Sequence, residues 1–417
     1  MKIRITSIAL LVVVIFTSTN GQLNLNTCDR ITRHGYPCEK HTVTTSDGYI
    51  LSLFRIPASS RKNEVSPKPN KPAVLLMHCL LCSSDIFVLA GPNDGLPFML
   101  ADDDYDVWIG NARGNVYSQR HTSLSPLSEA FWSFSMDEIG LIDIPAKIEY
   151  ILAATNQTQL HYIGYSQGTL VLAILLSAKP RYSEKLKAVH LLAPAIFMCH
   201  VRSPPILLFA HFLGKPSPAA NIIGTFPSQE IFGFLRLFAN GVCKNALFTE
   251  LCIKILNLFS GWDSPYLNRT LLPEMLLTTP AGGSNLQINQ YLQLATSCEF
   301  KAYDYGPEGN IRKYGKPKPP VYNVTNIQTR EPIEFYYAEN DFLAAWEDVK
   351  DLYGVLGDRA KWNRVRYRKY NHFDFTLSTN VKSCINNCIL DRLDKYEGRP
   401  FKGDLCKCFR KEPFPSK

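Results

Sequence analysis

Short apolar runs recur along the first half of the chain and again near its end. The early runs are continuous rather than alternating, which is typical of strands buried on both faces of a parallel sheet. They span residues 73–77, 106–109, 160–163 and 189–192, and strand-like runs resume at 333–337 and 364–370. Further upstream, β-rich runs at 41–45 and 49–56 flank Asp47-Gly48, which predicts a hairpin.

Helical periodicity fills the spaces between these runs. Ser135 and Glu138 fit a capping box, and apolar residues then recur on one helical face from 144 to 152. Pro145 is expected to kink this helix or to start a second helical piece. The almost wholly apolar segment 169–178 follows a strand directly and predicts a core helix. Strands and helices alternate, so we expect an α/β fold with a mostly parallel central sheet.

The pattern changes between residues 197 and 320. Here Phe-rich helical stretches at 206–213, 230–238 and 246–259 are broken by Pro and Gly. We expect a core formed by 22–196 and 321–380 and interrupted by a helical insertion at 197–320. A separate helical domain is the alternative, which the strands that resume afterwards disfavour. A Cys-rich C-terminal extension occupies 381–417.

The first 21 residues have the three parts of a secretory signal peptide. Lys2 and Arg4 precede an apolar run at 8–16, and small polar residues follow up to Gly21, where we expect cleavage. The alternative, a membrane anchor, is disfavoured because a spanning helix needs ~20 apolar residues. No later segment reaches spanning length. We therefore expect a secreted protein, with the lysosomal lumen as the other possible destination.

Sequons and cysteines agree with an exported protein. Three acceptor triplets begin at Asn156, Asn268 and Asn323. The even number of cysteines, 12, suits disulfides in an oxidising compartment. Four of them lie in the tail, at 384, 388, 406 and 408, where metal binding is the less favoured alternative.

Composition excludes several other classes. With 417 residues, 46% hydrophobic and 20% charged, the chain is long and apolar enough for a large folded core. The net charge of +8 is modest, and basic residues are dispersed apart from the tail. We therefore expect no nucleic-acid partner.

Gly164-Tyr165-Ser166-Gln167-Gly168 is a G-x-S-x-G sequence, the strongest chemical signal in the chain. The motif alone is weak, but it lies between a predicted strand and a predicted helix. In such a turn the glycines make room for neighbouring chain, and the serine hydroxyl is exposed on a strained corner. We interpret Ser166 as a nucleophile, with an ordinary turn serine as the alternative.

A serine hydroxyl needs a base, and the base needs an acid to orient it. In folds with this turn the partners follow in the order Ser, acid, His. His372 comes after the last predicted strand and is the expected base, whereas His190 lies in a strand pattern and two further histidines lie in the insertion. Asp341 follows the run 333–337 and is the expected acid. Its nearest competitors are Glu339 and Asp374.

The oxyanion that develops when a serine attacks a carbonyl group needs backbone N–H donors. One comes from the residue after the nucleophile, here Gln167, and one from the loop after an earlier strand. The run 73–77 leads into His78-Cys79-Leu80, so the N–H of Leu80 is the expected second donor.

Together these residues resemble the acid lipase family, which includes gastric and lysosomal acid lipases and their insect relatives. The resemblance covers nearly the whole mature chain. Besides the Ser166 motif, it rests on Ile31 with 35–37, on 47–51, 105–111, 113–115, 131–135 and 137–138, and on 280–284, 322–324, 340–341, 371–372 and 374–375.

The resemblance implies an α/β-hydrolase fold with an inserted cap, and hydrolysis of neutral lipid esters, either triacylglycerols or sterol esters. Ser166, Asp341 and His372 fall on the triad positions, and Leu80 and Gln167 on the oxyanion-hole positions. Cys243 and Cys252 match the disulfide of the family's cap, and a third family cysteine corresponds to Ser260.

The chain departs from the family at two positions near the expected site. Cys79 replaces the glycine of the usual His-Gly-Leu, and Tyr165 replaces the commoner histidine before the nucleophile. We expect two-step acyl transfer without metal or organic cofactor, on a lipid ester at a lipid–water interface, with part of the cap moving there. The alternatives are a carboxylesterase for short soluble esters and a catalytically silent lipid-binding protein.

Overall fold

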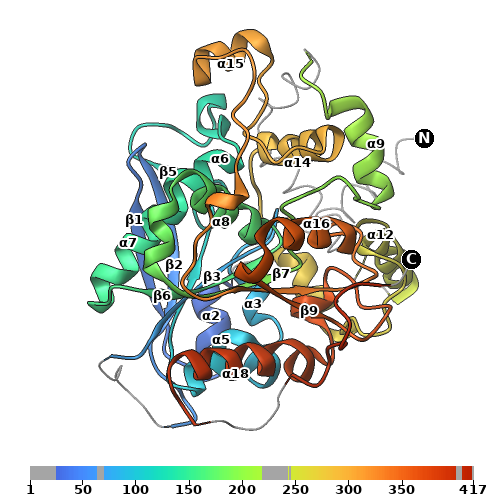
Figure 1. Cartoon of the computed structure of the whole chain (residues 1–417). Helices are drawn as coiled ribbons and strands as arrows, with labels where there is room; N and C mark the ends of the chain where they lie inside the picture. Colours follow the sequence, from blue (N-terminus) through green and yellow to red (C-terminus); the bar gives the residue numbers. More distant parts are fainter. Residues whose placement is uncertain (1–24, 63–69, 218–242, 244–245, 401–405, 416–417) are drawn as a thin grey trace, which may run out of the picture.

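A nine-stranded sheet runs through the middle of the computed structural model (Figure 1). The structure describes residues 25–62, 70–217, 243, 246–400 and 406–415, so the predicted signal peptide 1–21 and the predicted helix 230–238 lie outside the described residues. The strands are β1 (Glu39–Thr44), β2 (Tyr49–Ile56), β3 (Ala73–Met77), β4 (Asp106–Gly110), β5 (Arg120–His121), β6 (Leu160–Tyr165), β7 (Leu186–Leu192), β8 (Ile333–Tyr337) and β9 (Ala360–Arg364).

The strand order confirms the expected α/β class. The order is β1-β2-β4-β3-β6-β7-β8-β9, with β5 beside β2. Strands β1 and β2 form the antiparallel hairpin, β2 is antiparallel to β4, and the pairs from β4 to β9 are parallel. Every residue of β3, β4, β6 and β8 is buried, which explains why these strands appear as continuous apolar runs.

The last strand was predicted in the wrong place. The expected run 364–370 is mostly turn, and β9 ends where that run begins. Strand β9 lies at the edge of the sheet, where Lys361 is exposed to solvent. An edge strand does not need a continuous apolar run, so the apolar pattern did not reveal it.

Helices cover both faces of the sheet. Their bounds are α2 (Thr27–Thr32), α3 (Asp85–Val88), α4 (Gly91–Asp94), α5 (Leu96–Asp102), α6 (Met136–Glu138), α7 (Ile144–Thr155), α8 (Gln167–Ala178), α9 (Pro204–Leu213), α12 (Ala246–Ser260), α13 (Leu272–Thr278), α14 (Asn285–Ser297), α15 (Pro307–Tyr314), α16 (Trp346–Leu356), α17 (Asp374–Leu377) and α18 (Asn387–Tyr396). The connections through α7, α8 and α16 move along the sheet in one direction, and the connection through α5 moves in the other. Right-handed crossovers therefore place α5 on the opposite face.

The helix before β6 begins as its sequence predicts. The Ser135 hydroxyl accepts the Asp137 N–H, and the Glu138 carboxylate accepts the Ser135 N–H, which completes the capping box. A π-helical turn follows, and α7 then starts with Pro145 in its first turn. Residues 136–155 are continuously helical, so Pro145 leaves the i−4 carbonyl oxygen of Leu141 without a helical donor, and that oxygen accepts the Lys179 ammonium at 2.8 Å instead.

Between β7 and β8 the described chain is mainly helical and includes α9 and α12 to α15. Helices α9, α14 and α15 lie at the top of the view in Figure 1, beyond the sheet. Disulfides Cys199–Cys298 and Cys243–Cys252 staple this stretch.

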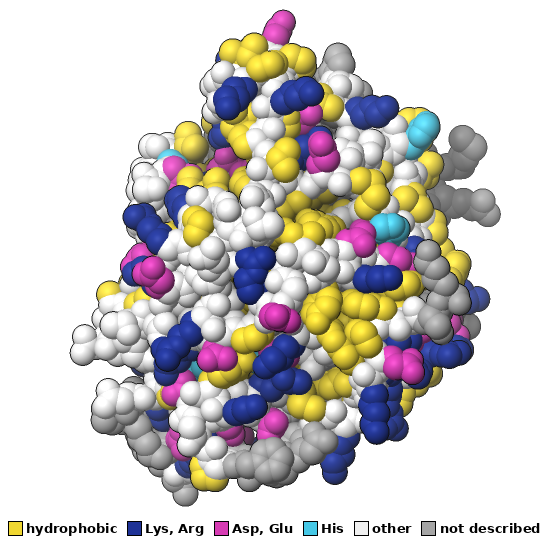
Figure 2. All heavy atoms as spheres, in the orientation of Figure 1, with side chains coloured by type: hydrophobic (Ala, Val, Ile, Leu, Met, Phe, Trp, Pro, Cys, Tyr) yellow, Lys and Arg dark blue, Asp and Glu magenta, His cyan; other side chains and the backbone are white. Residues whose placement is uncertain are grey.

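The C-terminal part packs onto the sheet rather than standing apart from it. Ile389 and Leu393 of α18 are fully buried, and α18 contacts β7. Disulfides Cys384–Cys408 and Cys388–Cys406 close the segment, so its four cysteines are paired with one another. On the face shown in Figure 2, basic and acidic side chains are interspersed rather than gathered by sign. Among the described residues, no helix is long and apolar enough to cross a membrane.

Candidate active site

Ser166 stands at the sharp turn between β6 and α8. Its φ of 54° and ψ of −110° are a conformation that side-chain-bearing residues rarely adopt. A Cβ at Gly168 would overlap the carbonyl oxygen of Met77, and one at Gly164 would lie 2.7 Å from the carbonyl oxygen of Gly168. Both positions therefore require glycine. The close approach at Gly168 packs the turn against the end of β3.

Three predicted site residues from distant parts of the chain lie in one hydrogen-bonded row. The Ser166 Oγ is 2.9 Å from His372 Nε2, and His372 Nδ1 is 2.8 Å from Asp341 Oδ2. A carboxylate only accepts, so Nδ1 carries the ring proton, and Nε2 is free to accept the serine O–H. Ser166 is 5% exposed, His372 is 2% exposed and Asp341 is fully buried, so the row is almost closed off from water.

The Asp341 carboxylate is fixed by the loop after β8. Its Oδ1 accepts the N–H groups of Leu343 and Ala344 at 2.9 and 2.8 Å. The competitor Glu339 instead pairs with Arg364 at 2.7 Å. Of the two acids on this loop, Asp341 is the one placed against His372.

His372 is held through its backbone by two groups whose role the sequence did not reveal. The Tyr165 hydroxyl donates to the His372 carbonyl oxygen at 2.9 Å. The His372 N–H donates to the carbonyl oxygen of Ser260 at 3.2 Å, and the Phe342 N–H donates to the same oxygen at 3.2 Å. Tyr165, at a position where the family more often has histidine, thus fixes the backbone of the base. Ser260 ties the base and acid loops together.

Asp374, the other competitor for the acid, is buried nearby but has different partners. Its Oδ2 accepts the Ser264 hydroxyl and the Asn371 N–H, both at 2.6 Å. Burial, with a smaller contribution from the charge of Asp341, raises the pKa of Asp374 to about 7. Asp374 therefore stabilises the loop that carries His372 through these hydrogen bonds and does not contact the imidazole.

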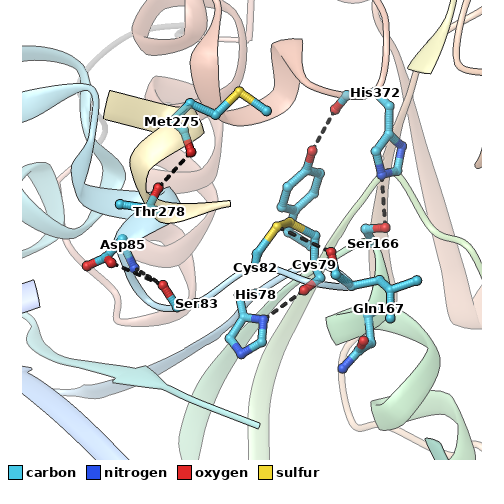
Figure 3. The surroundings of a disulfide bond; sticks show 12 residues. His78, Cys79, Cys82, Ser83, Asp85, Ser166, Gln167, Met275, Thr278 and His372 are labelled. Atoms are coloured by element: carbon cyan, nitrogen blue, oxygen red, sulfur yellow. Dashed lines mark hydrogen bonds between the residues drawn. A yellow bond between two sulfur atoms is a disulfide. The ribbon is translucent and has the colours of Figure 1, made fainter. Parts of the chain in front are cut away.

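The predicted oxyanion loop follows β3. In the described part of the chain, neither the Leu80 N–H nor the Gln167 N–H donates to a protein acceptor. Cys79, which stands where the family has glycine, forms a disulfide with Cys82 (Figure 3). The C-x-x-C spacing was visible in the sequence, but this pairing was not predicted. The side chain at position 79 is thereby turned into a cross-link within the loop.

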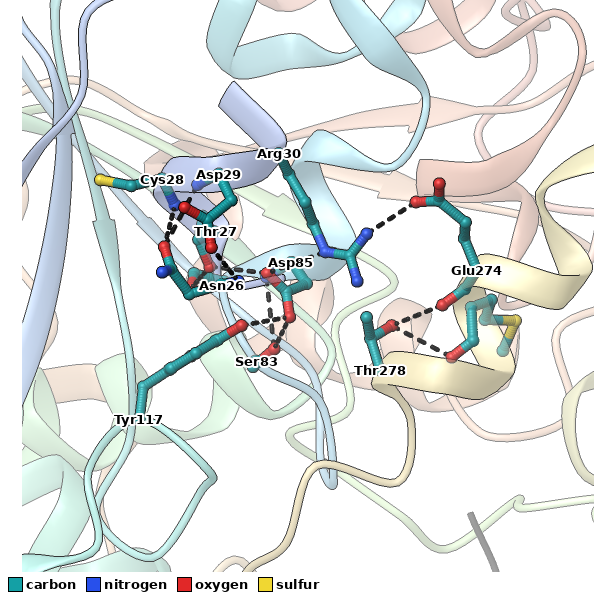
Figure 4. Close-up of polar contacts among 12 residues, drawn as sticks. Asn26, Thr27, Cys28, Asp29, Arg30, Ser83, Asp85, Tyr117, Glu274 and Thr278 are labelled. Atoms are coloured by element: carbon teal, nitrogen blue, oxygen red, sulfur yellow. Dashed lines mark hydrogen bonds and ion pairs between the residues drawn. The ribbon is translucent and has the colours of Figure 1, made fainter. Parts of the chain in front are cut away.

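The far end of this loop is anchored on a buried carboxylate. Asp85 accepts hydrogen bonds from the hydroxyls of Thr27 (2.6 Å), Tyr117 (2.7 Å) and Ser83 (3.2 Å), as Figure 4 shows. Burial raises the pKa of Asp85 despite these donors. The Arg30 guanidinium lies 3.6 Å from the carboxylate, so the N-terminal helix α2 and the loop are held to each other.

The remaining downstream histidines have other roles. His190 is fully buried in β7, and its Nδ1 lies 3.0 Å from the Tyr336 hydroxyl. His200, Asp348 and Asp351 are the one group of metal-ligand type found among the described residues. Asp348 already accepts the backbone N–H groups of Cys199 and His200, so it caps that turn.

Two models of known protein families match this chain. A family model described as "alpha/beta hydrolase fold" matches residues 72–377, and one described as "Partial alpha/beta-hydrolase lipase region" matches residues 27–91.

Three lipases are similar to this chain in sequence, and one solved structure shares its fold. Lipase 3 of Drosophila melanogaster is 36% identical and is covered over 95% of its length by 90% of this chain. Gastric triacylglycerol lipase of Bos taurus is 35% identical, with 89% of this chain and 91% of the relative covered. Lipase member K of Homo sapiens is 32% identical, with 91% and 93% covered. A solved Burkholderia cenocepacia protein described as an aryl esterase shares the fold, with a TM-score of 0.51 at 14% identity over 87% of this chain and 100% of that one.

Proposed function

The chain belongs to the acid lipase family of α/β-hydrolases, and from this premise we propose that it is a serine lipase that hydrolyses carboxylic esters of neutral lipids. The observation that carries the proposal is the contact of His372 with both Ser166 and Asp341. An alcohol becomes a nucleophile only when a correctly oriented base accepts its proton. The row supplies that base, in the tautomer that the reaction needs.

The proposed reaction proceeds in two acyl-transfer steps. Ser166 Oγ attacks the ester carbonyl carbon while His372 Nε2 takes the hydroxyl proton. The tetrahedral intermediate then collapses, the C–O bond to the alcohol breaks, and the alcohol leaves with the proton from His372. Water next attacks the acyl-serine with His372 again as base. The fatty acid leaves, and the proton returns to Ser166.

The N–H groups of Leu80 and Gln167 are proposed to stabilise the oxyanion in both steps. Donors of this kind act on charge that develops in the transition state, and each contributes roughly 10²–10³ in kcat. Gln167 begins α8, where the first N–H groups of a helix have no intrahelical acceptor. Leu80 is brought alongside because the Ser166 turn packs on the end of β3.

The substrate class is inferred from relatives and from the apolar insertion. One relative is named a gastric triacylglycerol lipase. In this chain, Leu208 and Phe212 of α9 and Leu251 and Ile255 of α12 are exposed, as is Trp262. Residues 197–320 are proposed to form a cap that meets a lipid–water interface. Burial of a long acyl chain contributes about 0.8 kcal/mol for each CH₂.

The cap is also proposed to control access. Ser166 is only 5% exposed, and part of the cap is proposed to cover it and to move when an ester binds. Contact with a lipid surface favours such a movement, because the apolar side chains exposed on α9 and α12 then leave water.

An exported location is proposed from three features. Residues 1–21 have the pattern of a signal peptide, and the twelve cysteines form six disulfides, which suit an oxidising compartment. Asn156 and Asn323 are exposed and Asn268 is partly exposed, so the three proposed glycosylation sites are accessible. A secreted protein, or one in the lysosomal lumen, has these properties.

Labelling with a fluorophosphonate probe tests the proposal. We expect the folded wild-type protein to be labelled covalently and Ser166→Ala to remain unlabelled with an unchanged melting temperature. Hydrolysis of emulsified long-chain triacylglycerol above that of short soluble esters identifies a lipase. Cleavage of short esters alone would favour a carboxylesterase, and an unlabelled folded wild type would favour a lipid-binding protein.

A further inference from the structure

We propose that the Cys79–Cys82 disulfide and the His78 ring are positioning elements that fix the direction of the Leu80 N–H for oxyanion binding. The inference rests on the proposed function, because it explains how the oxyanion loop of that site is held in position. It concerns residues 79 and 82, which contribute no group to the proposed proton transfers.

The geometry begins with a tight turn. The Cys82 N–H donates to the Cys79 carbonyl oxygen at 3.2 Å, so residues 79 to 82 form a four-residue turn with Leu80 and Leu81 in the middle. Leu81 has a φ of 58°, in the left-handed region that glycine usually occupies at such positions. A leucine there makes the turn easy to lose unless something else closes it. The disulfide joins the first and last residues of this turn.

The His78 ring forms a hydrogen bond with the Cys79 carbonyl group. Its Nδ1 lies 2.8 Å from the Cys79 carbonyl oxygen, and its Nε2 accepts the Ala112 N–H at 3.0 Å. The Asn115 amide nitrogen also lies 3.1 Å from Nε2. Nε2 therefore accepts and Nδ1 carries the proton. Burial lowers the pKa of His78 to about 4, so the ring remains neutral and keeps this tautomer at higher pH.

Holding this carbonyl determines where the Leu80 N–H points. The carbonyl of Cys79 and the N–H of Leu80 belong to one planar peptide group and point in opposite directions. Two donors on the oxygen and one covalent link around the turn therefore fix the direction of the N–H. Figure 3 shows this turn next to Ser166 and Gln167. Where the family has a glycine, this chain has a cross-linked turn that leaves the Leu80 N–H free for substrate.

Loss of the disulfide is expected to weaken binding of the transition state more than binding of the ester. A donor aimed at the oxyanion acts mainly once the carbonyl oxygen carries charge. In Cys79→Ser/Cys82→Ser we expect kcat on p-nitrophenyl butyrate to fall about 10- to 100-fold, less than the roughly 10²–10³ of a donor lost outright, because the Leu80 N–H is misdirected rather than removed. KM is expected to change less than about twofold.

A transition-state analogue and a rescue variant separate positioning from general damage. The inhibition constant of butylboronic acid, which forms a tetrahedral adduct on the serine, is expected to rise by about the same factor as kcat falls. Adding Leu81→Gly to the double serine variant restores a residue suited to positive φ, so part of kcat is expected to return. The matched control is Cys388→Ser/Cys406→Ser, which removes a disulfide of the tail and is expected to leave kcat unchanged.

The outcomes distinguish the two proposals. An active wild type whose kcat and boronic-acid affinity survive loss of the Cys79–Cys82 link overturns the positioning role alone. So does a loss that appears equally in the tail control or only in KM. A wild type that neither hydrolyses the ester nor binds the boronic acid overturns the proposed function itself. If the double serine variant does not fold, Cys79→Ala/Cys82→Ala gives the same readouts.

Discussion

The sheet core and the helical stretch between β7 and β8 differ in how far their apolar side chains are exposed to solvent. Strands β3, β4, β6 and β8 bury every side chain, whereas α9 and α12 expose leucines, isoleucines and phenylalanines. A core gains stability by hiding apolar surface, and a surface that keeps it exposed is available for an apolar partner. The contrast suggests that chemistry belongs to the core and substrate recognition to the insertion.

The same comparison shows where the two regions are joined. A short seam, residues 260–264, begins at the last residue of α12 and contacts the loops that carry Asp341 and His372. The Ser260 carbonyl accepts the N–H groups of Phe342 and His372, and the Ser264 hydroxyl donates to Asp374. A Cβ at Gly261 would overlap the Asn340 carbonyl oxygen. The end of α12 and the residues after it therefore support the loops that carry Asp341 and His372.

Asp341→Asn is the most damaging change expected in the core region. An amide can present its N–H to His372 and favour the wrong tautomer, so we expect kcat to fall about 10⁴-fold. Because the shape is nearly conserved, KM and the melting temperature are expected to change little. Steady-state kinetics on a soluble ester give the measurement. A loss of less than tenfold would assign the acid role to another residue, with Asp374 as the first to examine.

Asp374→Asn tests the link between seam and core through stability. In the folded protein the pKa of Asp374 is about 7, above its ordinary value of 3.8, because burial disfavours the charged carboxylate. The folded state therefore holds a proton that the unfolded chain has lost. This contribution is full below pH 3.8 and disappears as the pH rises through 7. At about 1.4 kcal/mol per pKa unit, the unfolding free energy declines by up to about 4 kcal/mol across this window.

The asparagine variant carries no titrating proton, so this decline is expected to vanish. Urea unfolding at several pH values between about 4 and 7 measures the slope. The exposed Asp358 provides the matched control, since Asp358→Asn is expected to leave the slope unchanged. Identical slopes for wild type and Asp374→Asn would contradict the assignment.

Gly261→Ala is expected to disturb the seam itself. Its φ of 132° and the nearby Asn340 carbonyl oxygen leave no room for a methyl group. The displaced Asn340 adjoins Asp341, and a shift of about 1 Å in a catalytic group can cost 10²-fold. We expect kcat to fall about 10- to 100-fold with a lower melting temperature. Gly354→Ala, where a Cβ meets no atom within 4 Å, is the control and is expected to behave as wild type.

Polar substitutions on the exposed helix are expected to have the smallest and most selective effect. Leu208 and Phe212 are 59% and 65% exposed. Leu208→Ser/Phe212→Ser is expected to lower activity on emulsified long-chain triacylglycerol about tenfold, because roughly 1–2 kcal/mol of surface attraction is lost. Activity on a short soluble ester is expected to remain. Leu127→Ser removes a still more exposed leucine (86%) outside the insertion and should leave both activities unchanged; if it lowers activity on the emulsion as much, the effect is not specific to α9.

The core was predictable because burial leaves a clear pattern in the sequence. Five of the parallel strands lie at or within a few residues of their expected positions, and the G-x-S-x-G turn lies between β6 and α8 as expected. The order Ser, acid, His along the chain, together with positions after predicted strands, led to Asp341 and His372 as the expected acid and base. The edge strand β9 was misplaced because its exposed positions need not be apolar.

The contacts that the sequence did not reveal involve backbone atoms or an unusual disulfide pairing. Tyr165 and Ser260 hold His372 by its carbonyl and N–H groups, and side-chain type does not reveal such bonds. Twelve cysteines allow many pairings, so Cys79 and Cys82 were not matched although they lie three residues apart. The seam joins segments distant in the chain, and only the folded backbone brings Gly261 against Asn340.

The position of this seam has a practical meaning for protein engineering. Chimaeras that exchange the helical stretch between relatives are best joined before Ser260, so that the 260–264 segment stays with its own acid and base loops. Grafts cut after Ser264 separate Ser260 and Ser264 from the acid and base loops that they contact, and lost turnover in such hybrids then reports a broken support instead of a changed lipid preference.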